Sequence, residues 1–205
     1  MTVMSTPAFG ESGPTFHEST RRRLTNQQAE TVAKLTEAAR EVLGEDGFEG
    51  MTIRSVAKRA GVAPATAYTY FSSKNHIVAE LFWRMLVNSV PEPDPSSPPA
   101  ARAADVLRHV ALVVAGEDQL AGAVTVALLG TDPDVEHLRL RVGGFIRERL
   151  ATALGVPMDS DDRRIELLEM LYSGALVRAG MGYGSYSDMA DRLGDAAKLL
   201  LEDLS

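Results

Sequence analysis

Cysteine is absent from this chain of 205 residues. Its absence excludes disulfide bonds, thiolate nucleophiles, Cys-ligated zinc and iron–sulfur clusters. Histidine is scarce, and the four histidines lie too far apart in the sequence to give a metal-binding spacing: His17, His76, His109 and His137. We therefore expect neither a metal site nor a cofactor.

Long hydrophobic runs are also lacking. The longest stretches without a charged residue, 60–73 and 119–131, have 14 and 13 residues, and a membrane-spanning helix needs about 18. The N-terminus does not show the basic and then apolar layout of a signal peptide. Aromatic residues make up only 6% of the chain, whereas alanine and leucine are plentiful. These features favour a soluble, helical, cytoplasmic protein without a membrane partner.

The net charge of −7 is unevenly distributed along the chain. Residues 1–84 carry a net charge of +1, residues 85–205 carry −8, and the stretch 50–84 alone carries +4. A basic segment on an acidic protein suggests that one end contacts a polyanion while the remainder has another role.

Apolar residues recur at helical spacing from Asn26 onward, and no segment has the alternation of a strand. This pattern predicts an all-α fold. The proline-rich segment 91–99 separates the N-terminal helices from the C-terminal ones, because a regular helix cannot pass through it. The expected helices are 26–47, 52–61, 66–71, 74–88, 100–116, 118–129, 133–154, 160–182 and 186–203.

The N-terminal part divides into a tail and a small helical domain. Residues 1–23 are expected to be a disordered tail, whose basic run 21–23 is either a solvated charge cluster or an arm that touches DNA. Residues 24–73 form a first expected helical unit, and residues 74–205 a second one.

The most informative motif spans residues 52–71. Two short helices are joined by a tight turn that begins at Gly61, which is the helix-turn-helix arrangement. Thr52 is a suitable N-cap for the first helix, and Pro64 suits the first turn of the second. Hydroxyl-bearing residues then cluster on the second helix, as expected for a helix that enters a major groove.

Residues 28–76 resemble the tetracycline-repressor (TetR) family of bacterial transcriptional regulators. The residues that carry the resemblance are Gly47-Phe48, Thr52-Ile53-Arg54, Val56-Ala57, Ala60-Gly61-Val62, Thr66, Tyr68, Tyr70-Phe71 and Ser73-Lys74. The resemblance implies a homodimer that binds a pseudo-palindromic, double-stranded DNA operator. It also implies that residues 24–73 are a DNA-binding domain with three helices, and that residues 74–205 are a ligand-binding and dimerisation domain. The fourth helix would link the two domains, and the last two helices would form the dimer interface.

The resemblance assigns a role to each matching position. Thr52 would cap its helix near a phosphate, and Arg54 would reach a base edge or a phosphate. Contacts to bases are implied for Pro64, Ala65, Thr66 and Thr69, and contacts to the DNA backbone for Tyr68, Tyr70 and Lys74. An ion pair for Arg54, and packed rings for the two tyrosines, are the structural alternatives.

Three positions of the second helix depart from the family pattern. Position 64 is Pro instead of a polar or basic residue, position 67 is Ala instead of Leu, and position 69 is Thr instead of a bulkier residue. The helix therefore lacks the Arg or Lys that most often reads guanine. Direct readout would depend on Arg54, on threonine hydroxyls and on methyl contacts from Ala65 and Thr66 to thymine.

The apolar pattern of the C-terminal helices predicts a small-molecule pocket and a dimer interface. The candidate pocket residues are mainly apolar and would take an apolar small molecule: His109, Val113, Phe145, Tyr172 and Leu176. The candidate dimer-interface residues lie on helices 160–182 and 186–203: Gly174, Ala175, Met189, Leu193, Ala197 and Leu200.

The resulting functional prediction is a ligand-responsive repressor that is released from its operator by an apolar small molecule. An activator of the same family, or a protein–protein adaptor that keeps the helix-turn-helix as a scaffold, remains an alternative. No acid–base pair, nucleophile motif or phosphate loop points to an enzyme.

Overall fold

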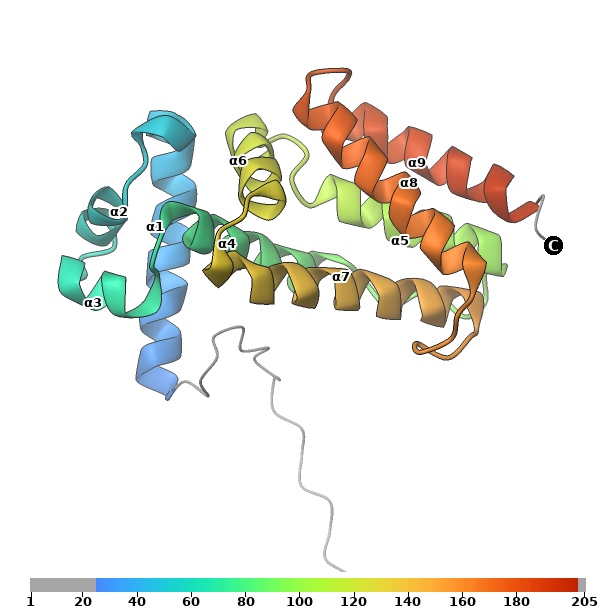
Figure 1. Ribbon diagram of the computed structural model, residues 1–205, viewed down its shortest axis with the longest axis horizontal. Coiled ribbons are helices and arrows are strands. Elements are labelled where there is room, and N and C mark those ends of the chain that lie inside the picture. The colour runs from blue at the N-terminus through green and yellow to red at the C-terminus, as the bar shows by residue number, and fades with distance from the viewer. Residues whose placement is uncertain (1–24, 203–205) are drawn as a thin grey trace, which may run out of the picture.

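The computed structural model describes residues 25–202, and these residues form nine α-helices and no strand (Figure 1). The all-α prediction is therefore confirmed, whereas the predicted N-terminal arm lies outside the described residues. The helices are α1 (Asn26–Gly50), α2 (Ile53–Arg59), α3 (Pro64–Tyr70), α4 (Lys74–Ser89), α5 (Pro99–Leu112), α6 (Asp118–Leu129), α7 (Pro133–Leu154), α8 (Arg163–Gly180) and α9 (Tyr186–Glu202).

Side-chain caps fix where the N-terminal helices begin. The Thr52 hydroxyl accepts a hydrogen bond from the backbone N–H of Ser55, and the Ser73 hydroxyl accepts one from that of His76. The regular part of α1 ends at Gly47, whose φ of +67° is readily adopted only by glycine. The chain then turns toward α2, as the sequence predicts.

Several predicted boundaries differ from the observed ones. Helix α3 begins at Pro64 instead of 66, because proline fits the first helical position, where no N–H is needed. Helix α5 ends at Leu112 instead of 116, and residues 113–116 form turns. Helix α8 begins at Arg163 because the Asp162 side chain caps it.

Helices α1–α3 lie at one end of the molecule, and α8 and α9 lie toward the other (Figure 1). Helix α4 runs from the α1–α3 unit into the C-terminal helices, where it packs against α6 and α7. Its buried residues include Ile77, Phe82 and Leu86. This helix therefore belongs to the cores of both parts of the chain.

Helix α6 is apolar over most of its length, but it is not buried on all sides. Val126 and Leu129 are 54% and 61% exposed, although Leu120 and Val124 are buried. The reason is that α1, α4, α7 and α8 pack against α6 without enclosing its whole circumference. Within residues 25–202, no helix is sufficiently long and apolar to cross a membrane.

Candidate nucleic-acid interface

Helices α2 and α3 are joined by a turn that the sequence encodes locally. The backbone N–H of Val62 donates to the carbonyl of Ala57 at 2.9 Å, which closes the turn. Gly61 has a φ of +65°, a conformation in which a side chain would be strained. Ala63 then precedes Pro64, the first residue of α3.

Most of α3 faces away from the protein. Its one fully buried residue is Ala67, which packs in the core with Val56 and Phe71. Tyr70 is half-buried, and the other members of the predicted base- and phosphate-contacting set on this helix are exposed: Pro64, Ala65, Thr66, Tyr68 and Thr69. The structure thus brings these residues together on one short helix with an open face.

Two exposed cations lie on α2 beside this helix. Arg54 and Lys58 have neither a hydrogen-bond nor an ion-pair partner within residues 25–202, which leaves both side chains available to an anion. Arg59, the third cation of α2, instead pairs with Glu41 and Glu45 of α1. Its guanidinium lowers the pKa of Glu45.

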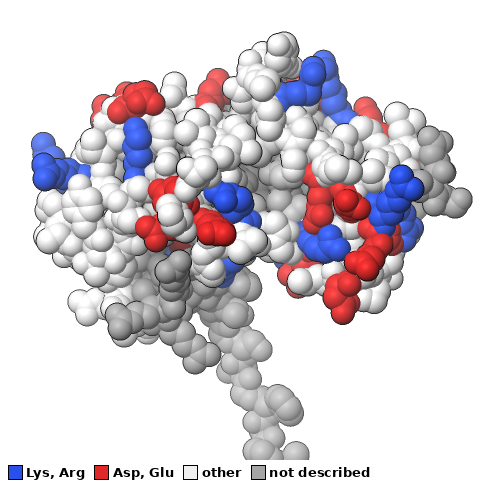
Figure 2. Space-filling model, viewed as in Figure 1, with Lys and Arg blue, Asp and Glu red and all other residues white. Residues whose placement is uncertain are grey.

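Charge is sparse on the visible surface at the α2–α3 end, where most side chains are neutral (Figure 2). Because the carboxylates of Glu41 and Glu45 on α1 neutralise Arg59, few unpaired cations remain beside α3. Hydroxyl and apolar groups make up the rest of that surface.

Lys74 has an intramolecular role that the sequence did not indicate. Its Nζ donates to the carbonyl of Phe48 at 2.8 Å and lies 4.2 Å from the centre of the Phe48 ring. The same Nζ lies 3.9 Å from the carboxylate of Glu49. Lys74 therefore holds the end of α1 against the start of α4, and its side chain remains 31% exposed.

Two polar contacts connect the α1–α3 unit to the C-terminal helices. Arg40 of α1 forms two hydrogen bonds with the carboxylate of Glu117, the residue before α6. Ser73, the N-cap of α4, donates its hydroxyl to the carboxylate of Asp132, the N-cap of α7. The contacts with α6 and α7 supplement the covalent path through α4.

The predicted pocket residues differ in their surroundings. The Phe145 ring lies edge-on to Trp83 of α4, with 5.9 Å between the ring centres. Tyr172 is buried, and burial raises the pKa of its phenol, with Tyr186 adding to the effect. Val113 is buried and Leu176 is half-buried. His109 is exposed and bonds the Asp105 carbonyl, so it does not face the interior.

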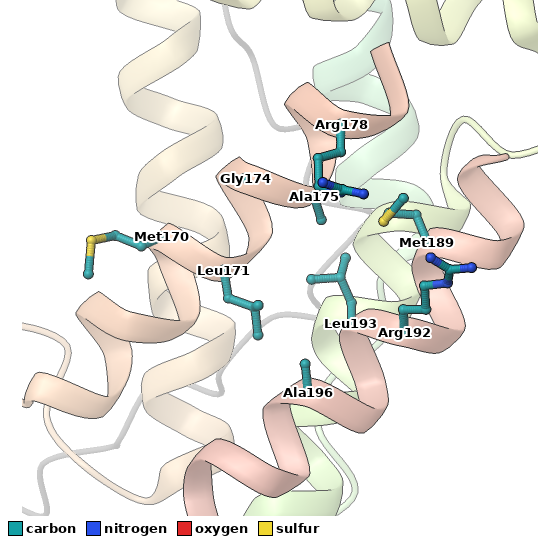
Figure 3. A pocket seen from close by; sticks show the side chains of 9 residues that line it. All are labelled: Met170, Leu171, Gly174, Ala175, Arg178, Met189, Arg192, Leu193 and Ala196. Carbon is teal, nitrogen blue, oxygen red and sulfur yellow. The ribbon is translucent and has the colours of Figure 1, made fainter. Parts of the chain in front are cut away.

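An open groove of about 550 Å³ runs between α8 and α9 (Figure 3). Its walls are mainly apolar, while Arg178 and Arg192 lie toward one end. None of the five predicted pocket residues lines it. The lining instead includes four predicted interface residues, Gly174, Ala175, Met189 and Leu193, together with Met170, Leu171, Arg178, Arg192 and Ala196.

The six predicted interface residues differ in exposure. Gly174 is exposed and Leu200 is half-buried, whereas the other four are buried within one chain: Ala175, Met189, Leu193 and Ala197. Helix α9 buries its apolar stripe mainly against α5. Packing inside one protomer therefore accounts for much of the pattern that the sequence analysis assigned to a partner.

The burial of the Glu80 carboxylate was not predicted from the sequence. Glu80 is 1% exposed, and its Oε1 accepts a hydrogen bond from Arg84 Nε at 2.8 Å. Burial raises its pKa, although Arg84 and Arg141 oppose the rise. Its other oxygen and the indole N–H of Trp83 find no hydrogen-bond partner within residues 25–202. A single acid inside the apolar run 77–83 was the available signal.

Comparison with known proteins agrees with this architecture. Residues 35–81 match the family model described as bacterial regulatory proteins, tetR family. An HTH-type transcriptional regulator of Mycobacterium tuberculosis is 44% identical over 202 residues, with 97% of this chain and 92% of that protein covered. The HTH-type transcriptional repressor KstR of Rhodococcus jostii is 26% identical and covers 87% of this chain and 86% of its own.

Solved structures share the fold. The crystal structure of a TetR transcriptional regulator from Rhodococcus sp. RHA1 superimposes with a TM-score of 0.72 and 25% identity, and covers 88% of this chain and 100% of that one. These comparisons confirm the predicted helix-turn-helix fold with its helical C-terminal domain. The chain belongs to the TetR family of bacterial transcriptional regulators, which bind DNA and are not enzymes.

Proposed function

We propose that this chain is a homodimeric repressor that leaves its operator when an apolar small molecule binds. The observation that carries the proposal is the placement of an exposed helix, α3, at one end of a chain whose other end has an open apolar groove that a second copy would cover. Helix α4 connects the two parts. Residues 24–73 would form the DNA-binding domain and residues 74–205 the regulatory domain, in the cytoplasm where the DNA lies.

The proposed DNA contacts follow the exposed residues of α2 and α3. Arg54 would contact a base edge or phosphate, because its guanidinium is exposed and unpaired within residues 25–202. Thr52 would lie near a phosphate, as would the hydroxyls of Tyr68 and Tyr70. Lys74 would add charge beside the DNA backbone while it holds Phe48. Pro64, Ala65, Thr66 and Thr69 would face the bases.

A second copy of the chain is the proposed occupant of the groove between α8 and α9. Gly174 supports this proposal, because a Cβ atom built there would meet nothing within 4 Å among residues 25–202. Glycine inside a helix costs about 1 kcal/mol relative to alanine, so a close approach by another helix would explain its presence. Met170 and Leu199, on α8 and α9, are 56% and 66% exposed and would be covered in the dimer.

The proposed inducer is apolar, because aliphatic side chains and rings dominate the interior between α4, α5, α7 and α8. Phe145 and Tyr172 would supply its ring contacts, and Val113 and Leu176 its aliphatic contacts. His109 could act only at the rim, since its ring is exposed and bonded to Asp105.

Repression is favoured over activation because the relative KstR, 26% identical over most of the chain, is named a repressor. For a ligand to relieve repression, it must bind the form that cannot hold DNA more tightly than the form that can. The contacts at Arg40 and Ser73 would transmit the change to the α1–α3 unit.

A footprint on the DNA next to the protein's own gene, followed by in vitro transcription from that DNA, tests the proposal. A panel of long-chain alkanols and alkanoic acids serves as the apolar probe. The expected result is a protected palindromic site, less transcript with protein added, and recovery of transcript with an active probe. More transcript on protein binding would indicate an activator. Absence of any protected site would favour an adaptor.

A further inference from the structure

The surface of α3 lacks the chemical groups that ordinarily read guanine and adenine. The thirteen residues 61–73 include no charged side chain, no amide and no histidine. Guanine is most often read by Arg or Lys, and adenine by Asn or Gln. The nearest cations along the chain are held elsewhere, Arg59 by Glu45 and Lys74 by the Phe48 carbonyl. The outward face of α3 must therefore read DNA through other groups.

Apolar groups make up much of that face. The first turn of α3 begins with Pro64 and Ala65, both exposed, and this end of a reading helix is the part that meets base edges. The Thr69 hydroxyl donates to the Ala65 carbonyl at 3.0 Å, so this hydroxyl cannot also donate a hydrogen bond to a base. Thr69 therefore offers DNA its methyl group and oxygen lone pairs, but no donor.

One major-groove group complements such a surface. The 5-methyl of thymine is the apolar group on the base-pair edges of the major groove, and alanine and threonine methyls are its usual partners. Resting on the proposed DNA-binding role, we propose that α3 recognises the 5-methyl group of pyrimidines through Ala65, Thr66 and Thr69. The chain then distinguishes thymine from cytosine by the methyl itself, and it accepts 5-methylcytosine at the same positions.

The expected effect follows from burial of a methyl group. Removing one buried methyl lowers affinity about fourfold. Replacing thymine with deoxyuridine removes that methyl and leaves every Watson–Crick and major-groove hydrogen-bonding group in place. The substitution therefore separates methyl contact from hydrogen bonding.

The experiment begins with selection of a preferred duplex from a random library with the full-length protein. Each thymine of the selected half-site is then replaced singly by deoxyuridine, and each T·A pair by C·G or 5-methyl-C·G, and affinities are measured by fluorescence anisotropy. At one or more positions, deoxyuridine should weaken binding about fourfold. At those positions 5-methyl-C·G should bind more tightly than C·G.

Protein variants assign the methyl contact. Thr69→Ser and Thr66→Ser each remove a methyl and retain the hydroxyl, so the deoxyuridine penalty should disappear at the position that each residue contacts. Thr31→Ser is the matched control, because Thr31 of α1 also donates its hydroxyl to a carbonyl four residues earlier, that of Gln27. The control should keep the full penalty.

A selected operator that binds deoxyuridine duplexes as tightly as thymine duplexes at every position would overturn methyl recognition, while the proposed repressor role would stand. Failure to select any preferred sequence would overturn both proposals. A penalty that survives in Thr66→Ser, in Thr69→Ser and in Ala65→Gly would likewise contradict the assignment to α3.

Discussion

The Ser73 hydroxyl donates a hydrogen bond to the Asp132 carboxylate, and each of these residues is the N-cap of a helix. Asp132 uses its other oxygen to accept from the N–H of Asp134, and Ser73 accepts from that of His76. The starts of α4 and α7 are therefore joined by one polar chain. A shift of either helix start alters the surroundings of the other, close to the end of α3.

Asp132→Asn should weaken the effect of the inducer on DNA affinity while it lowers the stability of the fold only slightly. The amide retains an oxygen that can cap α7, but it loses the charge that strengthens the bond from Ser73. We expect a stability loss of about 1 kcal/mol by urea denaturation and a smaller fall in DNA affinity when an active probe is added. Ser96→Ala is the control, since Ser96 bonds Asp94 in the connection between α4 and α5. An unchanged probe response in Asp132→Asn would contradict this coupling.

Arg54→Ala and Lys74→Ala should differ in their effects on folding. Arg54 is exposed and unpaired within residues 25–202, so its loss should leave stability unchanged, reduce the salt slope of DNA binding by roughly one and relax one base preference at a cost of about 1–3 kcal/mol. Lys74 holds the Phe48 carbonyl, so its loss should destabilise the protein by about 1 kcal/mol and also weaken DNA binding. Equal melting temperatures for the two variants would refute this assignment.

Caps and breakers made several features of this fold predictable from the sequence. Thr52, Ser73 and Gly47 act on residues within one helical turn, so the starts of α2 and α4 and the end of the regular part of α1 could be placed from sequence alone. Pro64 suited the first turn of α3, but the predicted start lay two residues too late. Long-range contacts were not predictable in this way. The partner of Ser73 lies 59 residues away, and its position depends on how α4 and α7 pack.

The C-terminal helices show a second limit. An apolar stripe on α9 was evident from Met189, Leu193 and Ala197, but its spacing does not tell which surface covers it. In the structure that surface is largely α5 of the same chain. The candidate interface is better defined by small or apolar residues that stay exposed in one protomer, such as Gly174 and Met170.

Gly174→Glu should disrupt the dimer and leave the protomer folded. A Cβ atom at this position has no neighbour within 4 Å in the protomer, but in the proposed bundle the added carboxylate would be buried without a partner, which is strongly unfavourable. Sedimentation should show a monomer at micromolar concentration and DNA affinity should fall, because one protomer grips one half-site. Gly174→Ala is the matched control for helix propensity. A wild-type monomer, or a dimeric Gly174→Glu variant, would show that the interface lies elsewhere.

Glu80 should make stability depend on pH. Burial raises the pKa of its carboxyl in the fold, so the protonated form is favoured there. Its contribution is fully present below the ordinary value of 4.5 and is lost as pH rises through the folded-state pKa. The unfolding free energy of the wild type minus that of Glu80→Gln should fall as pH rises, by at most about 1.4 kcal/mol per pH unit. Glu136→Gln, at an exposed site on α7, should show no such trend, and a parallel trend would contradict burial as the cause.

Trp83 should report the movement of α4 when an inducer binds. It is the sole tryptophan, is 5% exposed, and lies between the Phe145 ring and the Arg141 guanidinium, whose Cζ is 4.5 Å from the ring centre. A tilt of α4 against α7 changes both contacts, so emission should shift as DNA is released in one titration with an active probe. Spin labels at Ser72 should show that the recognition helices leave the separation of about 34–36 Å that successive major grooves require. Release of DNA with that separation unchanged would exclude a moving α4 and favour a change in flexibility without a change in shape.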